Sequence, residues 1–165
     1  MQPLARRLPT ETETPHIADA KHAAKDVAAL NGLLRGEISA VETYTQCINK
    51  LDDDTVKRTL ASLRQSHALR SDRIHNRILL LDGKPDEHSG LWGTIATLFE
   101  GSASFFGERV ALEALEEGER HGLRAYDRVT GISSPTRTFI NTQLLPEQER
   151  TASALSTLVR EFRGA

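Results

Sequence analysis

Cysteine and long apolar runs are what this sequence has least of. The 165 residues include a single cysteine, Cys47, which excludes an internal disulfide. One unpaired thiol is typical of a reducing compartment, so we predict a cytoplasmic protein. No stretch approaches the roughly 18 apolar residues that a transmembrane helix requires, so the sequence predicts no membrane span.

An excess of charge of one sign is also missing. The chain has 21 Lys and Arg residues against 23 Asp and Glu residues, which gives a formal net charge of −2. Nucleic-acid binding relies on clustered basic residues, and no block of like charge occurs, so we predict no nucleic-acid partner. The sequence contains neither a phosphate-binding loop nor a Gly-x-Ser-x-Gly nucleophile motif. The sequence therefore carries no motif that is typical of the common hydrolases or of nucleotide-binding enzymes.

What the chain does contain is helical periodicity. Aromatic residues make up only 5%, while leucine, alanine, glutamate and arginine are common, and this composition favours helix over sheet. Apolar residues recur at steps of three and four, which is the repeat of one helix face. The pattern predicts four long helices, at about residues 19–51, 54–82, 107–129 and 134–163. Residues 1–18 are predicted to be a flexible arm, and residues 19–165 the folded domain.

The connections between these helices predict how they pack. The first two are separated only by Asp52-Asp53-Asp54, which caps the second helix and makes the pair an antiparallel hairpin. The link at 83–106 is long and holds an apolar face around Trp92, which predicts an extra short helix before the third long one. We therefore predict an all-α, antiparallel four-helix bundle with that short helix in its middle link. Pro146 is expected either to kink the last helix or to break it.

A few polar residues interrupt the apolar seams of the predicted helices. Glu37 does so on the first helix, His67 and Arg70 on the second, and Glu119 on the third. The first and third helices also share a short pattern, because Gly36-Glu37 is followed by Tyr44 as Gly118-Glu119 is followed by Tyr126. Small residues four positions before each glycine predict a close approach of the two helices. The match either reflects a pseudo-twofold repeat or arises by chance.

The helix pattern, the Leu30-Asn31 start, the Glu42-x-Tyr44 step and the Gly118-Glu119…Leu123…Ala125-Tyr126 stretch resemble the ferritin-like superfamily. Within it, residues 20 to 163 look like a bacterial ferritin-like domain of unknown function. Ferritin-like di-iron proteins use one Glu from each of two helices and a Glu-x-x-His pair from each of the other two. The resemblance implies the following metal ligands: Glu37, His67, Glu119 and Glu149.

The sequence departs from the di-iron pattern at two positions. Arg64 stands where the resemblance expects the second-helix Glu, and Ala152 stands where it expects the fourth-helix His. Two irons would need about four carboxylates and two imidazoles, and only three and one are present. Arg64 also carries a permanent positive charge, which would repel a metal and pair with Glu37 or Glu119 instead. We expect a degenerate site filled by an Arg–Glu–His network, with no cofactor; a site for one iron or manganese ion is the alternative.

These observations lead to two hypotheses about function. The first is a non-catalytic bundle with a stress-related or protein-binding role. The alternative is a metal-binding protein, or an oxygen- or peroxide-related metalloenzyme of the ferritin-like or rubrerythrin type. We also expect a homodimer, formed through the Trp92–Phe106 segment or the helix faces. Cys47 is predicted to be a buried structural thiol, and His75 and His121 to be exposed or at the rim of the bundle.

Overall fold

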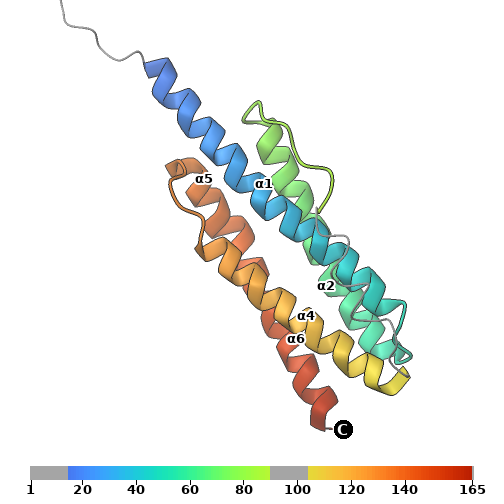
Figure 1. The fold of residues 1–165 in the computed structure, drawn as a ribbon. Coiled ribbons are helices and arrows are strands. Elements are labelled where there is room, and N and C mark those ends of the chain that lie inside the picture. The colour runs from blue at the N-terminus through green and yellow to red at the C-terminus, as the bar shows by residue number, and fades with distance from the viewer. Residues whose placement is uncertain (1–14, 90–103, 165) are drawn as a thin grey trace, which may run out of the picture.

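The structure is a computed structural model, and it describes residues 15–89 and 104–164. Within those ranges it is all-helical, as predicted, and four long helical stretches form a bundle (Figure 1). The stretches are α1 (Pro15–Ile48), α2 (Asp54–Leu79), α4 (Ser104–Asp127) and a continuous run of α5 (Ser134–Phe139), the π-helix η1 (Ile140–Leu144) and α6 (Leu145–Gly164).

Helices α1 and α2 lie side by side along most of their length (Figure 1). The predicted cap of α2 is confirmed, since the Asp53 carboxylate accepts hydrogen bonds from the backbone amides of Thr55 and Val56 at 2.7 and 3.0 Å. Past the end of α2, the chain comes back against α1 at Gly83. A Cβ atom there would lie 2.6 Å from Cγ2 of Val27, so only glycine fits this approach.

Several predicted boundaries differ from the structure. Helix α1 begins at Pro15, inside the range predicted as an arm, and α4 begins at Ser104, so Phe105 and Phe106 belong to its first turn. Helix α5 begins at Ser134, as predicted for the fourth helix; its N-cap is Ser133, whose hydroxyl accepts from the Thr136 amide at 3.4 Å. The rest of the arm and the short helix predicted in the link lie outside the described residues.

The chain remains helical through Pro146. Proline has no amide hydrogen to donate and crowds the preceding turn of an α-helix. Just before it, the amide of Leu145 donates to the carbonyl of Ile140, five residues back, which makes η1 a wider π-type turn. This wider turn is the local adjustment that joins α5 to α6 without an interruption.

The buried interior has two apolar clusters with a polar layer between them. One cluster contains Tyr44, Cys47, Leu51, Val56, Leu60, Leu63, Ala111, Leu112, Leu115, Leu155 and Val159. The other contains Leu30, Leu33, Leu34, Ile74, Ile78, Tyr126, Ile140 and Leu144. Along every helix, the residues that separate the two clusters are polar and buried. The bundle therefore holds one layer of charged and amide side chains across its middle.

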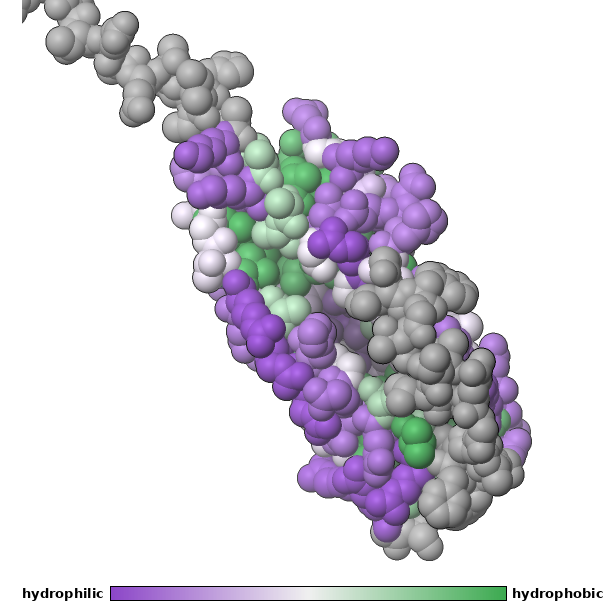
Figure 2. All heavy atoms as spheres, in the orientation of Figure 1, coloured by the Kyte–Doolittle hydropathy of each residue, from purple (hydrophilic) through white to green (hydrophobic). Residues whose placement is uncertain are grey.

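The surface is mainly hydrophilic on the side seen in Figure 2, where a strip of apolar side chains runs between two hydrophilic margins. Leu79 and Leu80, at the end of α2, are 51% and 77% exposed. Across the described ranges, no helix combines the length and the apolar character that a bilayer crossing demands.

Candidate functional site

The polar layer is built from all four helical stretches. Each helix places one or two polar residues on the same buried line as its apolar core positions, at steps of three or four. The layer consists of Glu37 from α1, His67 and Arg70 from α2, Glu119 from α4, and Gln148 and Thr151 from α6. All six side chains are buried. Glu37, His67 and Glu119 were predicted as site residues, and the structure brings them together.

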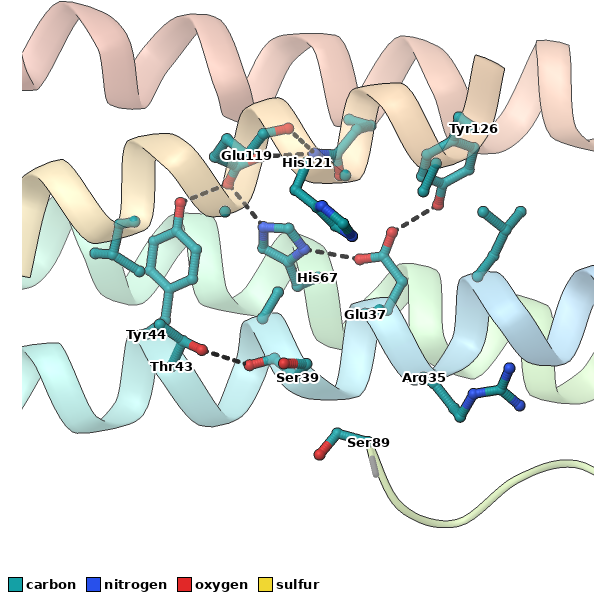
Figure 3. A pocket seen from close by; sticks show the side chains of 18 of the residues that line it. Arg35, Glu37, Ser39, Thr43, Tyr44, His67, Ser89, Glu119, His121 and Tyr126 are labelled. Atoms are coloured by element: carbon teal, nitrogen blue, oxygen red, sulfur yellow. Dashed lines mark hydrogen bonds and ion pairs between the residues drawn. The ribbon is translucent and has the colours of Figure 1, made fainter. Parts of the chain in front are cut away.

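His67 bridges the two carboxylates (Figure 3). Its Nδ1 atom lies 2.7 Å from Oε2 of Glu37, and its Nε2 atom lies 2.9 Å from Oε1 of Glu119. Burial alone would lower the pKa of His67, but the hydrogen bonds and negative charges of Glu119 and Glu37 outweigh it, so the pKa is raised. A carboxylate oxygen lies at hydrogen-bond distance from each ring nitrogen, and this geometry fits an imidazolium that donates one hydrogen bond to each carboxylate.

Arg70 lies beside His67 and supplies the second positive charge of the layer. Its Nε donates to Oε1 of Glu37 at 3.0 Å, and its Nη2 donates to Oε1 of Gln148 at 2.7 Å. Nη2 is also 2.7 Å from Nδ1 of His67, but a doubly protonated ring has no lone pair to accept there. Burial raises the pKa of Glu37, yet His67 and Arg70 outweigh that effect and lower it. Two carboxylates and two cations therefore balance in charge.

Two tyrosines link α1 and α4 through reciprocal hydrogen bonds. The hydroxyl of Tyr44, on α1, donates to Oε1 of Glu119 on α4 at 2.6 Å. The hydroxyl of Tyr126, on α4, donates to Oε1 of Glu37 on α1 at 2.6 Å. Burial and the nearby carboxylate raise the pKa of both tyrosines well above the usual 10.0, so both stay protonated donors. The repeated Glu and Tyr pattern therefore corresponds to a spatial exchange of partners.

The remaining acceptor positions of Glu119 are filled from α6. Nε2 of Gln148 donates to Oε2 of Glu119 at 2.7 Å. Oγ1 of Thr151 lies 3.3 Å from the same oxygen and 2.9 Å from the backbone carbonyl of Gln148, and its single proton serves one of these two acceptors. A Cβ atom on Gly122 would lie 2.8 Å from Nε2 of Gln148. Glycine at this position leaves room for the amide to reach the carboxylate.

Glu149, the fourth predicted ligand, does not join the layer. It is exposed, whereas the preceding residue, Gln148, is buried. The buried line of the last helix runs through Leu144, Gln148, Thr151 and Leu155, and the next residue along a helix points about 100° away. Ala152 is likewise one residue past this line. Glu149 therefore lies on the exposed face of the helix, apart from the other three predicted ligands.

Arg64 was expected to pair with Glu37 or Glu119, and this expectation was also wrong. It is half-buried, and its Nη1 donates to Oγ1 of Thr45 at 3.4 Å. The arginine that enters the layer is Arg70, which is the next buried position of α2 after His67. The predicted type of network is present, but another arginine supplies its charge.

The residues of the layer do not fit a di-iron centre. Within the described ranges, no group of three or more His, Cys, Asp or Glu side chains is arranged to hold a metal ion. Both ring nitrogens of His67 are directed at carboxylate oxygens, and the guanidinium of Arg70 occupies one side of Glu37. Two carboxylates and one imidazole fall short of the four and two that such a centre uses.

A cavity of about 490 Å³ opens between α1 and α4, next to the layer. Small residues line its walls, and side chains of the layer, including Glu37 and His67, form its floor (Figure 3). A Cβ atom on Gly36 or Gly118 would meet no atom within 4 Å. The predicted close approach of the helices at these glycines was therefore wrong, since the missing side chains leave a hollow instead.

A second polar cluster was missed by the sequence analysis. Asp26 is only 2% exposed, and its carboxylate accepts from the amide and the hydroxyl of Ser133 and from Oγ1 of Thr136 at 2.7 Å. Burial raises the pKa of Asp26, but these hydrogen bonds outweigh it and lower it. This cluster ties the first part of α1 to the start of α5. Its signal was present, because Asp26 lies four residues before Leu30 on the α1 seam.

The predictions for three other residues are confirmed. Cys47 is fully buried, and burial raises the pKa of its thiol to about 12, as expected for a structural cysteine. His75 and His121 are exposed, and His121 lies at the cavity (Figure 3).

Comparison with known proteins gives one match. Residues 25–131 match the family described as a domain of unknown function, DUF2383. This range includes α2 with His67 and Arg70, together with Glu37 and Glu119, and it ends before Gln148 and Thr151. No curated protein and no solved structure matches the chain.

Proposed function

The chain belongs to the DUF2383 family, and from this premise we propose that it is a non-catalytic binding protein built on a ferritin-like frame. In this proposal, a proton on His67 and the guanidinium of Arg70 supply the positive charge that metal ions supply in di-iron relatives of that frame. The protein then acts through what it binds and carries out no redox chemistry at the layer.

The observation that carries this proposal is the position of Arg70. Its side chain is 0% exposed and donates to Glu37 and Gln148, so a permanent cation is held at the carboxylates. A guanidinium stays charged at any pH that a protein tolerates. A second cation at the same carboxylates would meet repulsion from Arg70 and from protonated His67.

The ferritin-like arrangement is part of the proposal. It is supported by the order of the helices, in which short connections join α1 to α2 and α4 to α5, and a long link joins the two pairs. The polar layer also lies at the middle of the bundle, where such proteins build their metal sites.

One observation favours the alternative, a metal-binding protein or metalloenzyme. Oxygen atoms of Glu37 and Glu119 both approach the same imidazole, at 2.7 and 2.9 Å. Loss of one proton from His67 would free one ring nitrogen, which is a suitable ligand for iron, manganese or zinc.

Elemental analysis separates these two functions. The full chain is produced with added iron, manganese or zinc and purified without chelators, beside His67→Gln as a matched variant. The proposal expects no stoichiometric metal in either protein. Stoichiometric metal in the natural chain that is lost in His67→Gln, with helical content unchanged by circular dichroism, would overturn it.

A homodimer and a cytoplasmic location remain predictions. The segment expected to form the dimer lies outside the described residues, apart from its last three positions. Sedimentation equilibrium tests the prediction, because a dimer has twice the mass of the 18.2 kDa chain.

A further inference from the structure

The cavity between α1 and α4 has the size and lining of a small-molecule site. Its volume, about 490 Å³, lies within the range of roughly 300–1,000 Å³ that ligand pockets occupy. Most of its lining is apolar or lacks a side chain altogether, as at Leu33, Leu115, Gly36 and Gly118. Such walls suit the apolar body of a ligand.

The floor of the cavity offers hydrogen-bond acceptors. Tyr44 and Tyr126 use their hydroxyl protons on carboxylates, and both rings line the cavity. Oε1 of Glu37 accepts from Tyr126 and Arg70, whereas Oε2 accepts only from His67. A carboxylate oxygen has two lone pairs, so Oε2 has one acceptor position left. Oε1 of Glu119 has none, because it already accepts two hydrogen bonds, and Oε2 accepts from Gln148 with Thr151 beside it.

The charge of the floor argues for an uncharged ligand. Glu37 and Glu119 already make their ion pairs within the layer, with Arg70 and the His67 ring, so no charge of the layer is left to pair with a buried ion. Burying an uncompensated charge is expensive, whereas a neutral donor gains a hydrogen bond to a carboxylate. At the rim, Arg35 is already paired with Asp86 and supplies no free cation for an anionic ligand.

We propose that this cavity binds an uncharged organic molecule with an apolar body and one hydroxyl or amide N–H donor, which is presented to Oε2 of Glu37. This inference rests on the proposed function, since a metal at Glu37 would occupy the same acceptor. The inference specifies the chemical class of ligand for the binding role proposed above.

Two probes that differ only in the donor test this inference. 2-Naphthol carries a hydroxyl, and 2-methoxynaphthalene carries the same ring with the donor masked. Binding to the full chain is followed by calorimetry and by amide chemical shifts. Naphthol is expected to bind at one site, and the methyl ether about tenfold or more weakly, because a hydrogen bond to a charged group is worth about 1.5–3 kcal/mol. Absence of naphthol binding, or equal affinity for the two probes, would overturn the inference.

Variants then locate the site. Gly36→Leu and Gly118→Leu each place a side chain in the cavity from a position where an added Cβ meets no atom within 4 Å, and both should abolish naphthol binding. Asn76→Leu, at an exposed position of α2 that does not line the cavity, is the matched control and should bind as the natural chain does. Binding that survives both glycine substitutions would contradict the assignment. Metal content is measured on the same samples. Stoichiometric metal would count against the proposed function, whereas absent naphthol binding in metal-free protein would count against the ligand site alone.

Discussion

Tyr44 and Tyr126 lie seven residues after Glu37 and Glu119, respectively, and each donates to the glutamate of the other helix at 2.6 Å. The repeat in the sequence is thus a repeat of contacts, in which α1 and α4 each supply one carboxylate and one phenol. His67 lies between the two glutamates and is shared by both halves. The two remaining helices break this symmetry, since α2 supplies Arg70 where α6 supplies neutral Gln148 and Thr151.

The reciprocal contacts predict paired costs of mutation. Tyr44→Phe and Tyr126→Phe should each lower the free energy of unfolding by about 1.5–3 kcal/mol, because each removes a buried hydrogen bond to a carboxylate. Urea denaturation followed by circular dichroism measures both. An effect near zero in either variant would show that its hydroxyl contributes nothing to the layer.

Arg70 should be far more costly to remove than a surface arginine. Arg70→Met takes one partner from each of buried Glu37 and Gln148, and breaking a buried ion pair costs about 3–5 kcal/mol. Arg73→Met is the matched control on the same helix, since Arg73 is 41% exposed and pairs with Glu147 at the surface. That substitution should cost no more than about 1 kcal/mol. Equal losses in the two denaturation curves would contradict the buried ion network.

Gln148 and Glu149 test which face of α6 is buried. Gln148→Ala strips a partner from both Arg70 and Glu119 and should cost about 2–4 kcal/mol. Glu149→Ala changes an exposed side chain and should stay within about 0.5 kcal/mol. Thermal denaturation of the two single variants is sufficient. A larger loss of stability in Glu149→Ala than in Gln148→Ala would indicate that Glu149, and not Gln148, is the buried residue.

The protonation of His67 predicts a dependence of stability on pH. Its pKa is raised in the folded chain above the ordinary 6.5. The stability that it contributes is therefore fully present below pH 6.5, and it is lost as the pH rises through the raised folded value. The free energy of unfolding should fall over that window in the natural chain. His67→Gln removes this titration, so an unchanged pH slope in the variant would argue against a buried imidazolium.

Cys47 should resist alkylation in the folded protein. Its thiol is buried and its pKa is raised to about 12, so little thiolate forms near neutral pH. Iodoacetamide at pH 8 should label the unfolded chain and leave the folded chain unmodified, as read by mass spectrometry. Rapid labelling of the folded chain would mean that α1 opens at this position.

Periodicity made most of the fold predictable. The seams of the first three helices located Glu37, His67 and Glu119, since a charged residue on an apolar line must be buried with partners. Applying the same steps from Leu144 to Leu155 selects Gln148 and Thr151. A hypothesis that assigns metal ligands by residue type selects Glu149 instead, because an amide and a hydroxyl are not typical metal ligands.

Two features could not be read from spacing. Arg64 and Arg70 both lie near the seam of α2, and only the packing against α6 brings the guanidinium of Arg70 into contact with Gln148. The cavity depends on the distance between α1 and α4. Small residues permit either a close helix contact or a hollow, and the structure has the hollow.

In the proposed function, a proton on His67 and the guanidinium of Arg70 supply the positive charge of the layer. The most direct measurement is the ¹⁵N NMR spectrum of the His67 side chain at neutral pH, with and without one equivalent of Zn²⁺. We predict two protonated ring nitrogens, with shifts that Zn²⁺ does not change. A deprotonated ring nitrogen whose shift moves stoichiometrically with added Zn²⁺ would contradict it.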